Sequence, residues 1–194
     1  MKIGLFGGTF DPVHNMHVAI AEMSIAQFGL DEIWFLADLS PRRKNNVTDY
    51  RHRLNMIKLA CKNNPRHITD RLDIQKNGYT HDDQSFKKII NQHPDDEFYI
   101  ICGVDTIKHL DKWQNPELFL QNACFIVVPR PDSEIAELDR LTDLFMQNGH
   151  EFKYKILKTT TSHVSSSKIR LATKKHANDL NKSVLDYINE NKLY

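Results

Sequence analysis

Short apolar runs alternate along this chain with longer segments in which apolar residues recur every three or four positions. A short run bounded by turn-forming residues is typical of a buried strand, and the wider spacing is typical of an amphipathic helix. The runs predict strands at residues 3–6, 33–37, 68–72, 98–102, 125–128 and 154–157, with Gly7 and Gly8 ending the first of them. The spaced segments predict helices at residues 16–28, from a cap at Thr48 or Asp49 to Pro65, and at 82–92, 116–121, 133–147, 165–174 and 180–190.

Strands that alternate with helices of this length form βαβ units around a parallel sheet. The strongest runs are apolar at every position, as expected of strands that helices cover on both faces. We therefore predict an α/β fold, a Rossmann-like doubly wound parallel sheet flanked by helices with a small C-terminal helical extension. No repeat or linker divides residues 1–194, so we expect a single domain.

Composition narrows the function classes. The 194 residues carry a formal net charge of +1, and 40% of them are hydrophobic, which argues against a disordered chain and against a basic nucleic-acid-binding protein. Three widely spaced cysteines favour a reducing compartment, and no apolar stretch approaches a membrane helix. We expect a soluble, cytoplasmic protein with no nucleic-acid or membrane partner.

The segment after the first strand carries the clearest chemistry. Residues 7–17 (GGTFDPVHNMH) lead from a buried strand into a helix. Gly7 and Gly8 let backbone N–H groups approach a phosphate, and His14 and His17 fall on one side of the first helical turn. Two such donors beside a helix N-terminus form a pocket for a polyphosphate. A zinc site is the rival interpretation, but no third ligand accompanies the histidines.

Two further segments that follow strands carry groups suited to phosphate. Arg42, Arg43 and Lys44 form a basic run, which can equally be a solvated loop. Residues 165–167 are serines that can cap a helix, and Arg170 follows them by one turn. From the residues alone, an N-cap with a surface arginine is as good an interpretation as an anion site.

Five segments together carry a resemblance to a known family. Residues 7–17 resemble the G-G-T-F-D-P-x-H-x-G-H segment of the HxGH nucleotidyltransferase superfamily. The other four segments resemble motifs of one branch of this superfamily, the bacterial nicotinate-nucleotide adenylyltransferases. Residues 51–56 (RHRLNM) resemble the H-R-L-x-M helix of that branch, and residues 78–82 (GYTHD) resemble its S-Y-T-x-D segment. Residues 103–113 resemble its G-x-D and L-x-x-W motifs, and residues 164–170 (VSSSKIR) resemble its I-S-S-T-x-I-R signature. The segments occur in the family's order along nearly the whole chain.

The resemblance implies transfer of the adenylyl group of ATP to nicotinate mononucleotide, which gives deamido-NAD and pyrophosphate. It implies that the partners are ATP and a pyridine mononucleotide, with Mg²⁺ bound through ATP, and it leaves a homodimer open. Catalytic roles fall on His14, His17, Lys44 and Arg170. ATP binding falls on Gly7, Gly8, Thr9, Phe10, Gly103, Asp105, Ser165, Ser166 and Ser167, and the pyridine substrate on Tyr79, Thr80, Asp105 and Trp113.

Two positions depart from the family's pattern. Met16 stands where the family has the glycine between its histidines, and an arginine replaces the histidine of the P-P-H-K loop before Lys44. One alternative, independent of these departures, is another transferase of the same superfamily that acts on nicotinamide mononucleotide, phosphopantetheine or an alcohol phosphate. Another is a nucleotide-binding protein in which Met16 impairs catalysis, and a zinc hydrolase is more remote.

Overall fold

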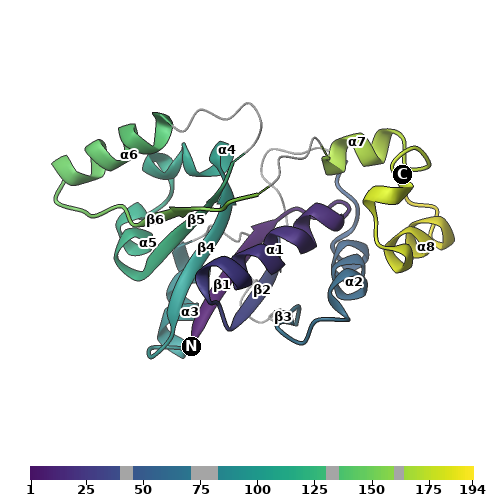
Figure 1. Cartoon of the computed structure of the whole chain (residues 1–194), viewed down its shortest axis with the longest axis horizontal. Coiled ribbons are helices and arrows are strands. Elements are labelled where there is room, and N and C mark those ends of the chain that lie inside the picture. The colour runs from purple at the N-terminus through teal and green to yellow at the C-terminus, as the bar shows by residue number, and fades with distance from the viewer. Residues whose placement is uncertain (40–45, 71–82, 130–135, 160–163) are drawn as a thin grey trace.

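The computed structural model describes residues 1–39, 46–70, 83–129, 136–159 and 164–194. Their core is a six-stranded sheet in the order β3-β2-β1-β4-β5-β6, and every neighbouring pair is parallel (Figure 1). The predicted doubly wound α/β fold is confirmed. The strands are β1 (Lys2–Gly8), β2 (Glu32–Ala37), β3 (His67–Ile68), β4 (Glu97–Gly103), β5 (Ala123–Val128) and β6 (Tyr154–Ile156).

Helices connect the strands and extend the chain beyond β6. Gly29, with φ at 65°, ends the first helix in the left-handed conformation that glycine favours, and the Asp49 side chain caps the second. The helices are α1 (Asn15–Phe28), α2 (Tyr50–Cys61), α3 (Asp83–Gln92), α4 (Val104–Ile107), α5 (Pro116–Asn122), α6 (Ala136–Gln147), α7 (Ser166–Leu171) and α8 (Lys182–Glu190), with 3₁₀ turns η1 (Leu110–Lys112) and η2 (Ala177–Asp179).

The strand order reverses direction at β1, which lies between β2 and β4. Gly8 is opposite Ala37 on one side, and Phe6 is opposite Ile101 on the other. A doubly wound sheet binds its ligand at such a switch point, beyond the carboxyl ends of the strands. The segment that follows Gly8 lies at that position.

The two faces of the sheet support separate hydrophobic clusters. Successive strand residues alternate between them, so Leu5 and Ile100 belong to one cluster, while Phe6 and Ile101 belong to the other. The first cluster packs under α3, α4, α5 and α6, and the second packs under α1, α2, α7 and α8. Figure 1 shows α1 across the sheet and α7 and α8 together beside α2.

The last two helices form the predicted C-terminal extension, held against α2 by polar contacts. Tyr187 of α8 contacts Nδ1 of His52 at 2.9 Å and accepts a hydrogen bond from Asn55 at 3.1 Å. Lys62 donates to Ser183 at the other end of α2. Among the described residues, no helix combines the length and apolar character needed to cross a bilayer.

Several predicted boundaries were wrong. The first strand was predicted to stop at residue 6, but Gly7 and Gly8 pair with β2 and belong to β1, which ends at Gly8. The helix predicted at 165–174 ends at Leu171, and the short α4 and η1 were not predicted. Of the described residues of the strand predicted at 68–72, Ile68 belongs to β3, which begins one residue earlier at His67, and residues 71–72 lie outside the described part.

Candidate functional site

The turn after β1 is built around the buried ring of Phe10. This residue has φ at 49° and is 2% exposed, and its ring packs edge-on against Phe6 at 5.5 Å and against His17 at 5.0 Å between centroids. A Cβ at Gly8 would lie 3.1 Å from that ring. The missing side chain of Gly8 makes room for Phe10, and the expected approach of its backbone to a phosphate stays a prediction. An ATP contact by Phe10 would have to come from its backbone.

His14 and His17 meet at the N-terminus of α1. The rings lie on one side, as the spacing predicted, and they stack with centroids 3.7 Å apart and planes 24° from parallel. The backbone N–H of His14, the N-cap, donates to Nδ1 of His17 at 3.1 Å. A neutral His17 must then carry its ring proton on Nε2. The pair therefore adds donors to the positive end of a 14-residue helix.

Asp11 is the buried acid of this turn, at 2% exposure. Its Oδ1 accepts a hydrogen bond from the Tyr194 hydroxyl at 2.5 Å, and its Oδ2 accepts one from the backbone N–H of Thr48 at 3.2 Å. Arg170 donates to the Asp11 carbonyl at 2.7 Å and places the same nitrogen 3.9 Å from Oδ2. A buried carboxylate is stable only when paired and hydrogen-bonded in this way.

Arg53 of α2 supports the turn from below. The side chain is 1% exposed and donates to the carbonyls of Thr9, Thr48 and Leu39 at 2.8, 2.8 and 3.3 Å. Burial lowers the pKa of its guanidinium, and nearby Asp11 opposes that change. Arg53 thus joins the segments that follow β1 and β2.

The segment at the start of α7 closes one side of the site. Ser165 caps α7 by accepting from the N–H of Lys168, as predicted. Ser166 donates to the carbonyl of Pro12 at 2.9 Å, and Ser167 accepts from Arg170 at 3.3 Å. The serines and Arg170 therefore lie against the turn that carries His14.

The opposite side of the site follows β4. Gly103 ends that strand, and Asp105, 55% exposed at its side chain, lies 4.0 Å from Lys108. The Trp113 ring is half-buried and packs edge-on against Phe119, with centroids 5.1 Å apart. Because β4 is the neighbour of β1, Gly103 and Asp105 lie next to the histidine turn along the sheet edge.

Met16 lines a small hollow beside α1. The hollow has a volume of about 180 Å³ and is bounded by Asn15, Met16, Ala19, Val164, Asn178 and Asp179. It lies between the start of α1 and the C-terminal segments that carry Val164 and η2, and Met16 is the residue that departs from the family's glycine. A larger hollow of about 270 Å³ lies near His93 and Asp96, at the amino ends of the strands and away from His14 and His17.

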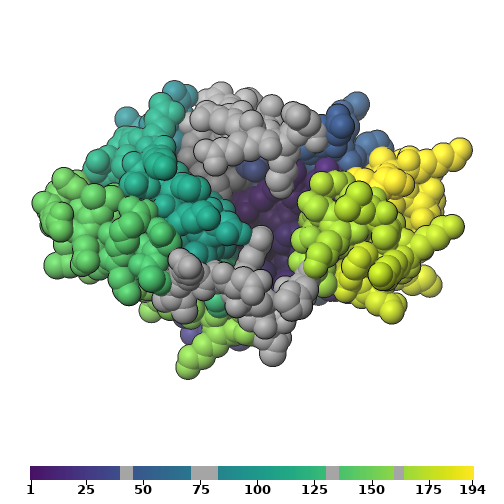
Figure 2. Space-filling view, turned by 90° about the horizontal axis from the view of Figure 1, so that it is seen from above, coloured from purple at the N-terminus to yellow at the C-terminus, as the bar shows by residue number. Residues whose placement is uncertain are grey.

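The structure brings most of the predicted site residues to one edge of the sheet. Figure 2 looks onto this edge and shows the N-terminal segment, in purple, recessed between the teal residues after β4 and the yellow-green α7. The predicted Lys44, Tyr79 and Thr80 lie outside the described residues. Within the described part, histidines, cysteines and carboxylates form no group of three or more that could hold a metal ion.

Sequence reasoning gave no role to several residues of this site. Asp11 and Arg53 occur inside the quoted motifs, so their positions could have marked them, but their hydrogen bonds come from distant segments. Thr48 was considered only as a helix cap. Tyr194 is separated from Asp11 by 183 positions, and no local pattern indicates their contact.

Comparison with known sequences gives a consistent result. The cytidylyltransferase-like family model matches residues 5–172. The nicotinate-nucleotide adenylyltransferase of Bacillus subtilis is 42% identical over 134 residues, covering 67% of this chain and 70% of that protein. The probable nicotinate-nucleotide adenylyltransferase of Lachnoclostridium phytofermentans is 32% identical over 173 residues, covering 87% of this chain and 85% of its own length.

Solved structures share the fold at lower identity. The nicotinic acid mononucleotide adenylyltransferase of Plasmodium falciparum, complexed with NaAD, superposes with a TM-score of 0.80 and 22% identity, covering 100% of this chain and 97% of its own. The same enzyme complexed with APC gives a TM-score of 0.77. These likenesses concern the fold.

Proposed function

Because this chain belongs to the cytidylyltransferase-like family, and within it to the nicotinate-nucleotide adenylyltransferases, we propose that it transfers the adenylyl group of ATP to nicotinate mononucleotide. The products are deamido-NAD and pyrophosphate. The observation that carries the proposal is the stacked pair His14 and His17 at the N-terminus of α1, beside Arg170 and at the switch point of the sheet.

Adenylyl transfer joins two anionic phosphates, so the protein must position them and neutralise their charge. The 5′-phosphate oxygen of the acceptor attacks the α-phosphorus of ATP in line, the bond to the β-phosphate oxygen breaks, and pyrophosphate leaves with the electron pair. The attacking oxygen is already anionic near neutral pH, so no strong base is needed. His14 and His17 would donate to the phosphates as negative charge moves to the leaving group, and Lys44 and Arg170 would stabilise that charge.

Mg²⁺ enters the proposal as part of the substrate. The triphosphate supplies the oxygen ligands that the ion prefers, so ATP would arrive as its magnesium complex. The backbone of residues 7–10, Gly103 and the serines before and within α7 would surround it. The exposed carboxylate of Asp105 would bind a ribose or help to place the metal.

The acceptor would bind on the β4 side of the same edge. A half-buried tryptophan offers a flat surface on which a pyridine ring can stack, and Trp113 is anchored by Phe119 beneath it. Tyr79, Thr80 and Asp105 would bind the remainder of the acceptor. This division puts ATP over α1 and α7 and the pyridine nucleotide over α4 and η1.

An acceptor panel tests the proposal. Purified protein with ATP and Mg²⁺ is offered nicotinate mononucleotide, nicotinamide mononucleotide or phosphopantetheine, and pyrophosphate release is measured. We expect the highest kcat/KM with nicotinate mononucleotide. A preference for another acceptor would favour a different nucleotidyltransferase. ATP binding measured by calorimetry, without turnover on any acceptor, would favour the alternative that Met16 impairs catalysis.

Three broader expectations stay predictions. Limited proteolysis would test whether residues 1–194 behave as one domain, and fractionation of the source cells would test the cytoplasmic location. Sedimentation at several concentrations would show whether the protein forms the homodimer that the sequence leaves open.

A further inference from the structure

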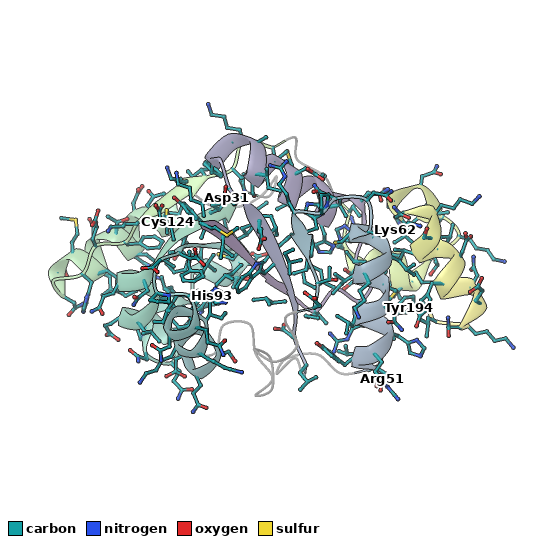
Figure 3. The ribbon with its side chains drawn as sticks, turned by 90° about the horizontal axis from the view of Figure 1, so that it is seen from below. Asp31, Arg51, Lys62, His93, Cys124 and Tyr194 are labelled. Atoms are coloured by element: carbon teal, nitrogen blue, oxygen red, sulfur yellow. The ribbon has the colours of Figure 1, made fainter. Side chains whose placement is uncertain are left out.

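Tyr194 makes a long-range contact with the phosphate-binding turn. The residue as a whole is 40% exposed, while its hydroxyl donates to Oδ1 of Asp11 at 2.5 Å. Figure 3 shows Tyr194 between α2 and the C-terminal helices, toward the end of α2 that carries Arg51. Burial and the bond to Asp11 raise the pKa of this phenol, so it remains a protonated donor at any working pH.

The bond from Tyr194 completes the set of partners of a buried carboxylate. The other oxygen of Asp11 faces the Thr48 N–H and Arg170, so each oxygen has its own partners and the carboxylate has a defined orientation. Loss of the phenolic donor would leave Oδ1 at a position that is 2% exposed with one hydrogen bond fewer. A buried acceptor that loses its donor is costly, and the turn can relieve that cost only by moving.

Movement of Asp11 would reach the groups proposed to act on ATP. Arg170 donates to the carbonyl of Asp11, and His14 lies three residues after Asp11 in the same turn. The next carbonyl, that of Pro12, accepts from Ser166. The geometry therefore links the Tyr194 hydroxyl through Asp11 to both sides of the triphosphate site.

We propose that Tyr194 is a positioning residue for adenylyl transfer, whose hydroxyl holds Asp11 so that the turn presents His14 and Arg170 to the reacting phosphates. This inference rests on the proposed function. Tyr194 does not touch the substrates; it acts through Asp11, and the effect belongs to the transition state more than to acceptor binding.

The chain offers a matched control in Tyr187. Its hydroxyl also bonds to distant side chains, His52 and Asn55, but these lie on α2 away from the turn. Replacing either tyrosine by phenylalanine keeps the ring and removes one buried or half-buried hydroxyl. Tyr194→Phe should lower kcat about tenfold, the effect of losing roughly 1.4 kcal/mol of transition-state stabilisation, and leave the KM for nicotinate mononucleotide within about twofold. Tyr187→Phe should leave both constants near those of the wild type.

A substrate-free measurement separates this inference from the proposed function. In spectra of protein with labelled histidines, Tyr194→Phe should shift the ring signals of His14 and His17, whereas Tyr187→Phe should shift those of His52. If the wild type turns over no acceptor, the proposed function fails and these spectra alone decide whether Tyr194 positions the turn. Unshifted His14 and His17 signals, unchanged kcat in Tyr194→Phe, or an equal loss of kcat in both variants would overturn the role of Tyr194.

Discussion

The backbone N–H of His14 and the Nδ1 atom of His17 lie 3.1 Å apart, in a hydrogen bond that sets the His17 tautomer. One imidazole nitrogen accepts the N-cap hydrogen bond of α1, and in the neutral ring the other carries the proton. His17 therefore combines a capping role with the proposed catalytic one, and substitutions can separate the two.

His17→Ala should lower turnover by about two orders of magnitude, the usual effect of removing one donor to a developing charge. His17→Gln should lose similar turnover while retaining the cap, since glutamine at this helical position can accept from the N-cap N–H. Urea denaturation should show His17→Ala to be less stable than His17→Gln by about 1 kcal/mol. Near wild-type turnover in the glutamine variant would contradict the catalytic role.

Arg53→Met should cost about 3 kcal/mol of unfolding free energy, because it removes the donor to three carbonyls from a buried position. Arg51→Met, two positions away, is the control. The Arg51 side chain is 87% exposed and pairs only with Asp49 among its described contacts. Its replacement should therefore change the free energy of unfolding by no more than about 0.5 kcal/mol. Equal urea midpoints for the two variants would show that Arg53 does not hold the turn.

Met16→Gly should lower the KM for ATP about fivefold, with kcat little changed. Met16 lines the hollow beside the histidine helix, and a methionine that must move aside for a ligand costs on the order of 1 kcal/mol. Met16→Ala separates side-chain volume from the helix-weakening effect of glycine and should give a smaller change in the same direction. A KM for ATP that is the same in all three proteins would show that the thioether is harmless.

His67 should make stability depend on pH. Burial lowers the pKa of its imidazole below the ordinary 6.5, although Glu22 opposes the change. The unfolded chain then binds a proton that the folded protein does not. The stabilisation is complete above about pH 6.5 and is lost as the pH falls toward the folded pKa, by at most about 1.4 kcal/mol per pH unit.

Unfolding free energies of wild type and His67→Gln between pH 8 and 5 would measure this effect. The variant should lose less stability on acidification than the wild type does. His150→Gln, in the connection from α6 to β6, is the matched histidine control. Identical pH slopes in the wild type and His67→Gln would contradict the role of His67.

The buried thiols should be unreactive in the native protein. Burial raises the pKa of Cys61 and of Cys102 to about 12 each, so almost no thiolate is present at pH 8. Ellman's reagent should label neither of them until urea is added, when all three cysteines of the chain should react. Peptide mapping after labelling would identify the sites, and rapid native labelling of Cys102 would be inconsistent with its position inside β4.

The sequence predicted the parts of this protein that depend on local pattern. Phe98 to Cys102 could be predicted as a buried strand because every residue in it is apolar. A cap at Thr48 or Asp49 could be predicted because both precede a helical period, and the structure has Asp49 as the cap. The position of His14 and His17 on one side followed from their spacing, whereas the stacking of their rings did not. Each of these inferences needs only a few neighbouring residues.

Contacts between distant segments could not be predicted in this way. The strand was expected to stop at Gly7, but pairing with β2 carries it through Gly8. The role of Gly8 depends on the ring of Phe10 folding back beneath it, in a backbone conformation that phenylalanine rarely adopts. Likewise, Arg53 and Tyr194 become part of the site only when α2 and the last residues of the chain pack against the turn.

The two hydrophobic clusters give the sheet a consequence for evolution. The helices over one face carry most of the groups proposed for the adenylyl donor, and the segment after β4 over the other face carries Trp113, together with Asp105, which is proposed for both substrates. Mutations that accumulate around Phe119 can therefore reshape the acceptor's surroundings while Ile20 and Ile57 keep the donor's support intact. Such an arrangement allows related proteins to change the acceptor they use while the residues proposed to bind ATP stay the same.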